Sequence, residues 1–347
     1  TAGDINGDGF ADLVIGAPNA NFLTGVDGFG YAGKSYVIFG RSNWSGISAL
    51  NLSLIAAGSG GFALNGENLD DNSGYSVATV GDINSDGYSD FIVSAGVTEM
   101  SFAVSKSYVV FGKANWSGVS TLNLSTIAAG TGGFVLVAET ALDKSGTSVA
   151  AIGDINADGY ADFILGAIGA NSTAGKSYVV FGRASWSGVS TLNLSTIAQG
   201  SGGFVVNGEA LGDNSGYSVS PAGDINGDGY ADLIVGAPFA MSAAGQSYII
   251  FVGARFITSR LVQGSATVTG TVADEAVVGS TGADVLTGGG GIDRFFGGAG
   301  NDTIVLTSSD ISNLANVSVT SVRATVDGGT GIDTLRLSDG ANLNLTT

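Results

Sequence analysis

A nine-residue motif, D-x-N-x-D-G-x-x-D, occurs four times in this chain and constrains its fold more than any other feature. The copies span residues 4–12, 82–90, 154–162 and 224–232. Each copy has oxygen-bearing side chains at positions 1, 3, 5 and 9 and a glycine at position 6. Oxygen ligands in a flexible loop suit Ca²⁺ better than Mg²⁺, which demands tighter octahedral geometry. The sequence therefore predicts four calcium sites.

The candidate ligands are the four side chains of each loop and the main-chain carbonyl at position 7. In chain order they are Asp4, Asn6, Asp8, Phe10 and Asp12; Asp82, Asn84, Asp86, Tyr88 and Asp90; Asp154, Asn156, Asp158, Tyr160 and Asp162; and Asp224, Asn226, Asp228, Tyr230 and Asp232. Without a cation, three carboxylates in one short loop would repel one another. Four loops that all keep the same ligand positions make turns without metal a poor explanation.

The EF-hand is the main competing interpretation, because its loop begins in the same way. An EF-hand also needs a bidentate glutamate at position 12 and a helix on each side. Position 12 is apolar in every copy: Ile15, Val93, Leu165 and Val235. The EF-hand is therefore excluded.

The loops belong to a longer repeat, because their starting positions, 4, 82, 154 and 224, are separated by 78, 72 and 70 residues. Runs such as KSYVVFG (106–112) and SGYSV (73–77) recur with the same period and are rich in β-branched and aromatic residues. Four strands in a unit of about 70 residues are typical of a propeller blade. One helical turn is compatible with NLSTIAAG (123–130).

The pattern SGYSV, GDINxDGxxD, GAP and GKSYVxFG resembles the FG-GAP repeat of integrin alpha-subunit β-propellers. The resemblance covers residues 1 to about 255, although GAP itself is present only at 16–18 and 236–238. It implies an all-β fold whose calcium loops rigidify the blades. The first copy lacks its SGYSV strand, so we expect the chain to be a piece of a longer protein with further blades upstream.

A second repeat follows, after a stretch, 256–278, that we expect to be a connection. Nonapeptides with glycine at positions 1 and 4 and aspartate at position 6 begin at 279, 288, 297 and 328. Repeats of this form coil into a calcium-binding parallel β-roll, and they resemble the repeats-in-toxin (RTX) family. The sequence thus predicts a short roll in residues 279–347. Asp284 and Asp302 are expected to share an ion on one edge, with Asp293 on the opposite edge and Asp333 completing its site.

Composition limits the chemistry further. The chain has no cysteine and no histidine, which excludes disulfides, thiol or imidazole catalysis and the usual zinc sites. The net charge of −18 makes nucleic acid and anionic membranes poor partners. No apolar run of about 18 residues is present, so no transmembrane segment is expected.

Two recurring groups have a functional and a structural interpretation. Trp44, Trp116 and Trp186 could stack on a sugar, but packing between blades is the commoner reason for a repeated tryptophan. Glu67, Glu139 and Glu209 could be extra metal ligands or polar caps of a loop, and we prefer the second interpretation.

Together these features predict a calcium-stabilised, non-catalytic protein, extracellular or on a bacterial cell surface, that acts in adhesion or cell-surface interaction. Its partners would be cell-surface or matrix proteins or glycans, and self-association is a further possibility. Two alternatives stay open: a structural subunit of a surface layer or extracellular filament, and an accessory region of a secreted hydrolase or lyase.

Overall fold

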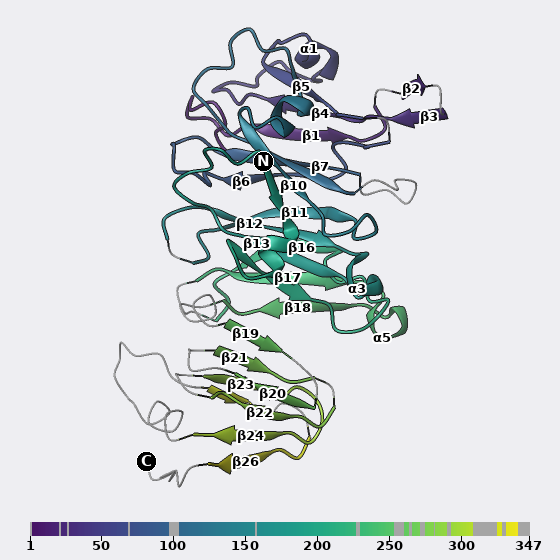
Figure 1. Ribbon diagram of the computed structural model, residues 1–347. Helices are drawn as coiled ribbons and strands as arrows, with labels where there is room; N and C mark the ends of the chain where they lie inside the picture. The colour runs from purple at the N-terminus through teal and green to yellow at the C-terminus, as the bar shows by residue number, and fades with distance from the viewer. Residues whose placement is uncertain are drawn as a thin grey trace. The chain divides into compact units, whose positions relative to one another are not determined.

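Strands dominate the protein, and the chain divides into two compact units, Thr1–Phe251 and Val252–Thr347 (Figure 1). The computed structural model describes residues 2–20, 22–25, 28–68, 70–96, 104–156, 158–226, 230–252, 260–263, 266–270, 275–280, 282–289, 293–307, 325–327 and 331–338.

In the first unit, each FG-GAP-like repeat forms one mainly antiparallel sheet (Figure 1). The first sheet contains β1 (Leu13–Ala17), β4 (Lys34–Ile38) and β5 (Gly61–Asn65), beside a hairpin of β2 (Phe22–Gly25) and β3 (Gly28–Tyr31). The second contains β6 (Val77–Gly81), β7 (Asp90–Ala95), β8 (Lys106–Val110) and β10 (Gly133–Val137). The third contains β11 (Ser145–Gly153), β12 (Asp162–Ala167), β13 (Lys176–Val180) and β15 (Gly203–Asn207). The fourth contains β16 (Ser218–Gly223), β17 (Asp232–Ala237) and β18 (Gln246–Ile250).

The described part of the first repeat has no strand equivalent to β6, β11 and β16, so β1 ends its sheet. This agrees with the missing SGYSV segment. Each of the other three repeats starts with such a strand, and each calcium-loop motif connects it to the next strand of its sheet.

Short helices complete the unit. The helical turn expected in the NLSTIAAG segments is present in three copies, α1 (Leu52–Ala56), α2 (Leu124–Ala128) and α4 (Leu194–Ala198). Two further turns, α3 (Ala170–Thr173) and α5 (Ala240–Ala243), include residues in the left-handed region.

Successive sheets are joined by apolar cores and by exchanged strands. β9 (Thr121–Asn123), from the second repeat, pairs in parallel with β5 of the first, and β14 (Thr191–Asn193), from the third, pairs with β10 of the second. Phe62 and Phe91 contribute to the core between the first two sheets, and Phe134 and Phe163 to the next. The repeats are therefore a continuous packed series, as in a propeller.

The second unit is a parallel β-roll with two sheets. One contains β19 (Arg260–Gln263), β21 (Glu275–Val278), β23 (Arg294–Phe296) and β25 (Thr325–Asp327). The other contains β20 (Thr267–Thr269), β22 (Val285–Thr287), β24 (Thr303–Leu306) and β26 (Thr334–Leu337). The apolar residue at position 8 of the nonapeptides, as in Leu286, Phe295 and Ile304, is buried in the core between them.

The roll begins earlier than the nonapeptide pattern suggests. Residues 256–278, expected to be a connection, include β19, β20 and β21, which pair with strands of the roll. The nonapeptides that contain β20 and β21 keep the apolar residue that points into the core, Val268 and Val277, but each has only one of the two glycines and neither has the aspartate by which the repeat is recognised. The expectation of a connection was therefore wrong for these strands.

Candidate metal centres

The first calcium-loop motif folds around its own polar side chains. Asp4 accepts hydrogen bonds from the backbone amides of Gly7 (2.7 Å), Asp8 (3.1 Å) and Gly9 (2.8 Å). The Asn6 side-chain oxygen accepts the amide of Asp8, and the Asp8 carboxylate accepts the amide of Phe10. Gly9 has a φ of +86°, in the region that favours glycine, which explains the residue at position 6. The motif thus closes a tight loop with its oxygen side chains inside.

The second and third loops repeat this arrangement. Asp82 and Asp154 each accept an amide from position 6 of their own loop at 2.8 Å. Asn84 and Asn156 each accept the amide of position 5, at 3.0 Å. In the fourth loop Asp224, Asn226, Tyr230 and Asp232 are described, whereas the predicted ligand Asp228 lies outside the described residues.

The aspartate at position 9 is the most buried member of each set. Asp12, Asp90, Asp162 and Asp232 all have an exposed fraction of 0%. Asp12 accepts the amide of Ile5 with one oxygen (2.8 Å) and that of Gly40 with the other (2.7 Å). Two amides use only part of the acceptor capacity of a carboxylate, which has about four lone-pair sites.

Electrostatics favour a cation in these loops. Burial, reinforced by repulsion from Asp86 and Asp82, raises the pKa of Asp90 to about 8 despite the hydrogen bonds from two amides. Burial and the same pattern of neighbours raise the pKa of Asp162 to about 7. A divalent cation among such carboxylates would stabilise their charged forms. The residues therefore fit Ca²⁺, although no three acidic side chains of the described residues converge as a ready-made metal cluster.

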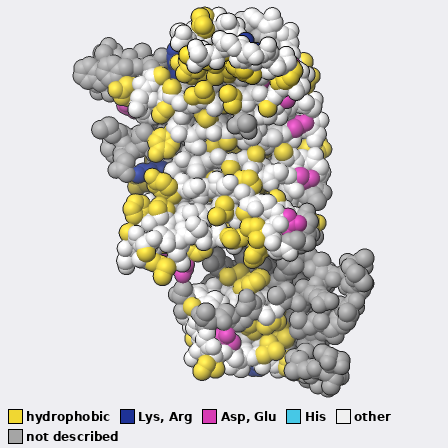
Figure 2. All heavy atoms as spheres, turned by 180° about the vertical axis from the view of Figure 1, so that it is seen from behind, with side chains coloured by type: hydrophobic (Ala, Val, Ile, Leu, Met, Phe, Trp, Pro, Cys, Tyr) yellow, Lys and Arg dark blue, Asp and Glu magenta, His cyan; other side chains and the backbone are white. Residues whose placement is uncertain are grey.

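The first two loops are also part of the junction with the next repeat. Ile5, Ile83 and Ile155, at position 2, are fully buried, whereas Ile225 of the fourth loop is 51% exposed. The carbonyl of Ile5 accepts the amide of Lys113 in the second repeat at 2.9 Å. A cation that orders a loop therefore also orders a contact between sheets. Figure 2 shows acidic side chains spaced along one edge of this unit.

In the roll, the aspartates form a ladder on one edge. The amide of Asp284 donates to the carboxylate of Asp302 at 2.9 Å, and the amide of Asp302 donates to Asp333 at 3.0 Å. The amide of Ala266 in turn donates to Asp284. The structure thus stacks Asp284 and Asp302 as expected.

Asp333, however, continues this same ladder, because β26 pairs with β24. The expectation that Asp333 completes the site of Asp293 was therefore wrong. The segment between the third and fourth nonapeptides contains β25, which pairs with β23, so the fourth nonapeptide returns to the first edge. Asp293 precedes β23 in the other sheet and is fully buried.

The ladder contains an orphaned polar atom. Asp302 is 1% exposed, and one of its carboxylate oxygens is buried with no hydrogen-bond partner. An unpaired buried carboxylate oxygen costs free energy unless a cation or donor satisfies it. The Asp302 position therefore also fits a calcium ion.

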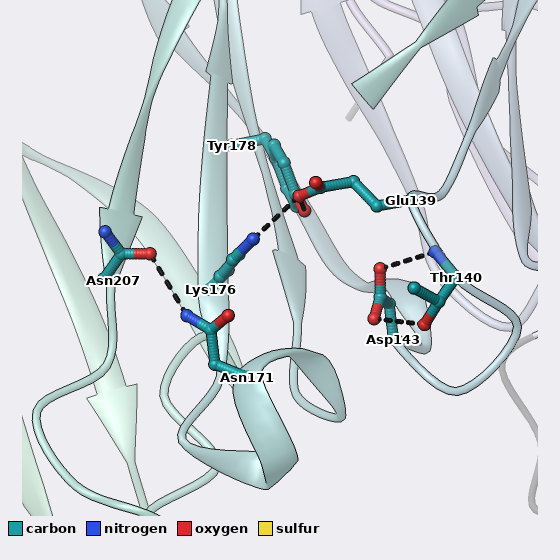
Figure 3. Close-up of polar contacts among 7 residues, drawn as sticks. All are labelled: Glu139, Thr140, Asp143, Asn171, Lys176, Tyr178 and Asn207. Carbon is teal, nitrogen blue, oxygen red and sulfur yellow. Dashed lines mark hydrogen bonds and ion pairs between the residues drawn. The ribbon is translucent and has the colours of Figure 1, made fainter. Parts of the chain in front are cut away.

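The recurring glutamates, considered as extra ligands, instead link consecutive repeats. Glu139 accepts hydrogen bonds from Lys176 (2.8 Å) and from the Tyr178 hydroxyl (2.5 Å) of the third repeat (Figure 3). Glu67 makes the same contacts with Lys106 (2.8 Å) and Tyr108 (2.6 Å). The sequence signal was the K-S-Y motif, whose lysine and tyrosine follow Glu67 by 39 and 41 residues and Glu139 by 37 and 39 residues.

The recurring tryptophans also pack between repeats. Trp116 stacks on Phe62 and Trp186 on Phe134, with ring centroids 4.5 Å and 4.3 Å apart. Lys113 and Arg183 lie over the same two tryptophan rings. The packing interpretation therefore holds for these two, and Trp44 is different, being 41% exposed.

Comparison with known families agrees with this geometry. The FG-GAP repeat matches residues 1–38, 73–98, 145–180 and 215–250, and the RTX calcium-binding nonapeptide repeat (4 copies) matches residues 269–305. The chain thus carries FG-GAP repeats followed by RTX repeats. The second match begins inside β20, in agreement with the early start of the roll.

Among curated proteins the chain is similar to integrin alpha-subunits. It is 35% identical to integrin alpha-7 of Homo sapiens over 181 residues, which is 50% of this chain and 13% of the integrin. It is 30% identical to integrin alpha-V of Gallus gallus over 239 residues, 68% of this chain and 19% of the integrin. With integrin alpha ina-1 of Caenorhabditis elegans it shares 58% identity over 36 residues, 10% of this chain and 3% of the integrin.

The chain therefore spans less than a fifth of the length of these relatives. The two repeat families indicate a calcium-binding protein of the cell surface or the secreted fraction. Among the helices in the described residues, none has the length and apolar character needed to cross a membrane.

Proposed function

We propose that this chain is a non-catalytic, calcium-stabilised part of an extracellular or cell-surface protein of bacterial type that acts in adhesion or cell-surface interaction. The observation that carries the proposal is the pairing of two calcium-binding repeat types in one chain, each with acidic groups that a cation would satisfy. The likeness to integrin alpha-subunits supports the adhesive role.

Calcium in this proposal would supply positive charge at the loops. The proposed ligands are the side chains at positions 1, 3, 5 and 9 of each FG-GAP loop, together with the carbonyl at position 7. In the roll they are Asp284, Asp302 and Asp333 on one edge, and Asp293 on the other. A ligand that binds only the folded chain stabilises it by mass action. Because free calcium is scarce inside cells and abundant outside, folding would be completed after export.

A mainly structural role of the loops follows from where they lie. Each of the first two loops buries an isoleucine in the junction with the next repeat, so a bound ion would fix neighbouring sheets against each other. The partners would then be cell-surface or matrix proteins, or glycans, recognised by surfaces away from the ions. With no histidine and no cysteine, the chain is also poorly equipped for catalysis.

The test is thermal unfolding of the whole chain in Ca²⁺, in Mg²⁺ and in excess EDTA, followed by circular dichroism. We expect a large rise in Tm with Ca²⁺ and a much smaller one with Mg²⁺, because the loops suit the larger ion. An unchanged transition in EDTA would contradict calcium stabilisation. Binding of the calcium-loaded chain to cells or matrix, compared with binding of the chelated chain, would test adhesion separately.

A further inference from the structure

One short strand of the first repeat, β5, and the two residues after it make several contacts with the second repeat. Phe62 in this strand stacks on Trp116, with ring planes 17° apart. Residues Ala63–Asn65 pair in parallel with Thr121–Asn123. Glu67, two residues beyond the strand, accepts hydrogen bonds from Lys106 and Tyr108. The segment G-F-A-L-N-G-E is therefore bound by three features of the second repeat: a tryptophan ring, the edge of β9, and a lysine with a tyrosine hydroxyl.

The junction between the second and third repeats uses the same three features. Phe134 stacks on Trp186, residues Val135–Val137 pair with Thr191–Asn193, and Glu139 is held by Lys176 and Tyr178. The recognised segment is here G-F-V-L-V-A-E. Two independent junctions thus define one recognition rule, G-F-x-φ-x-x-E, where φ is an aliphatic residue.

The first repeat has the same receptor residues but receives no such strand within the described part of the chain. Trp44 is 41% exposed, against 7% for Trp116 and 6% for Trp186. Arg41 lies over one face of its ring, 4.3 Å from the centroid, as Lys113 does over Trp116.

The rest of this face is open in the same way. Tyr36 is half-buried, whereas the equivalent Tyr108 and Tyr178 are fully buried. Residues 49–51, with the sequence Ala-Leu-Asn, correspond to the Thr-Leu-Asn segments that form β9 and β14 in the later repeats, but lie in no strand. Leu13 and Ile15 of β1, the second of which pairs with Tyr36, are 41% and 38% exposed.

We propose that this face, made of Lys34, Tyr36, Trp44 and residues 49–51 and called here the leading face, binds an extended G-F-x-φ-x-x-E strand. The strand would come from an FG-GAP blade outside these 347 residues. It would add to the edge at 49–51, as in other cases of strand addition. Its phenylalanine would stack on Trp44, and its glutamate would meet Lys34 and Tyr36.

The leading face has the same components as the two junctions between repeats already described, so we expect its partner to be another FG-GAP blade. The three matching strands of the chain itself are engaged elsewhere. β5 and β10 pair with β9 and β14, and the segment beginning with β15 ends at Glu209, which accepts a hydrogen bond from Tyr248 at 2.7 Å. A further blade therefore fits better than a second copy of this chain. The proposal does not depend on which residues bind calcium.

The experiment uses the full chain in calcium buffer and a fluorescein-labelled peptide, GSGGFALNGENL, the sequence of residues 58–69. Fluorescence anisotropy should show saturable binding. A peptide with alanine for the phenylalanine should bind at least ~10-fold more weakly, because a buried aromatic anchor dominates such contacts. Emission from Trp44, the exposed tryptophan, should shift to shorter wavelength on binding.

Two variants locate the contact. Trp44→Ala should weaken binding of the peptide by a similar ~10-fold factor. Lys34→Gln introduces the residue found at the equivalent position of the fourth repeat, Gln246, and should still fold. It should remove the preference for the glutamate peptide over its glutamine analogue. Leu142→Ala, at a side chain 70% exposed in the loop between β10 and β11, is the control and should bind normally.

Absence of saturable binding, or equal affinity for the phenylalanine and alanine peptides, would overturn the proposal. So would binding that Trp44→Ala leaves unchanged. Sedimentation of the chain alone tests whether a second copy of the chain, instead of a further blade, occupies the leading face. Concentration-dependent self-association that Trp44→Ala abolishes would assign the leading face to a second copy and overturn the choice of a separate blade.

Discussion

In the first FG-GAP loop, Asp4, Asp8 and Asp12 lie within nine residues of sequence, and the amides they accept come mostly from that same loop. In the roll, Asp284 and Asp302 are 18 residues apart and meet only because the chain coils. The first arrangement is local and the second depends on the fold being complete.

The two units also differ in what supports them besides acidic groups. Among the residues that the structure describes, the FG-GAP unit has two large apolar cores between sheets, aromatic stacks and Glu–Lys–Tyr contacts. In the described part of the roll, the core is small, with six buried residues. Calcium should therefore be essential for the roll and supplementary for the FG-GAP unit.

The largest effect is expected in the roll. Asp302→Ala should prevent calcium-induced protection of the β24 amides from hydrogen exchange, because it removes the buried carboxylate from the middle of the ladder. The FG-GAP unit should be unaffected. Arg336→Gln, at an exposed position in β26, is the control. Normal protection of β24 in Asp302→Ala would show that the ladder is not a calcium site.

A matched tryptophan pair tests the packing of the FG-GAP unit. Trp116→Ala should lower the free energy of unfolding of this unit by ~3–5 kcal/mol, as for other buried aromatics. Trp44→Ala should cost less than ~1 kcal/mol, because Trp44 is 41% exposed. Urea titration followed by circular dichroism measures both. Equal losses would mean that the leading face is already covered in solution.

Removal of one FG-GAP loop ligand should have an intermediate effect. Asp82→Ala should reduce the number of calcium ions bound by one, as measured by isothermal titration calorimetry. In saturating calcium the free energy of unfolding should fall by ~2–3 kcal/mol, the contribution of one ion at about a hundred times its Kd. Asn115→Ala, an exposed change outside the loops, should leave the stoichiometry intact. Unchanged stoichiometry in Asp82→Ala would remove this residue from the ligands.

The smallest effect concerns the Glu–Lys–Tyr contacts. Burial opposes the charge of Glu67, but hydrogen bonds from Lys106 and Tyr108 outweigh it, and its pKa lies below the usual 4.5. A lowered pKa in the folded chain stabilises it above pH 4.5, and this contribution is lost as the pH falls through the folded value. Glu67→Gln should therefore cost up to ~1 kcal/mol at pH 7, because the pair is partly exposed.

The difference between Glu67→Gln and the parent chain should shrink towards zero near pH 3, in urea titrations at both pH values. A difference that stays constant with pH would mean that the carboxylate charge has no part in the contact.

Much of the fold could be predicted because repetition exposes its pattern. The loops, the sheet of each repeat and the parallel roll all follow from residues that recur at a fixed period. The early coil of the roll was missed because Ala266 stands where the ladder has aspartate, which left periodic core residues such as Val268 and one glycine in each nonapeptide as the signal. Spacing could not place Asp333 either, because the pairing of β25 with β23 decides which edge the fourth nonapeptide occupies.

The contacts between repeats were predicted only in part. The tryptophans could be assigned to packing, because packing between blades is the commoner reason for a tryptophan that recurs at a fixed place in a repeat. The partners of Glu67 and Glu139 could not, because they lie in the next repeat and the sequence gives no distance between strands. The structure was needed to identify these partners, because the parallel pairing of β9 and β14 with the preceding sheets shows how consecutive repeats lie against each other.

The most direct test of the central claim is hydrogen exchange of the whole chain, read by mass spectrometry across a calcium titration. The account predicts that strands of the roll, such as β22 and β24, lose protection first as calcium is withdrawn, while β7 and β12 in the FG-GAP cores keep most of theirs. Loss of protection in both units at one calcium concentration, or in neither, would contradict it.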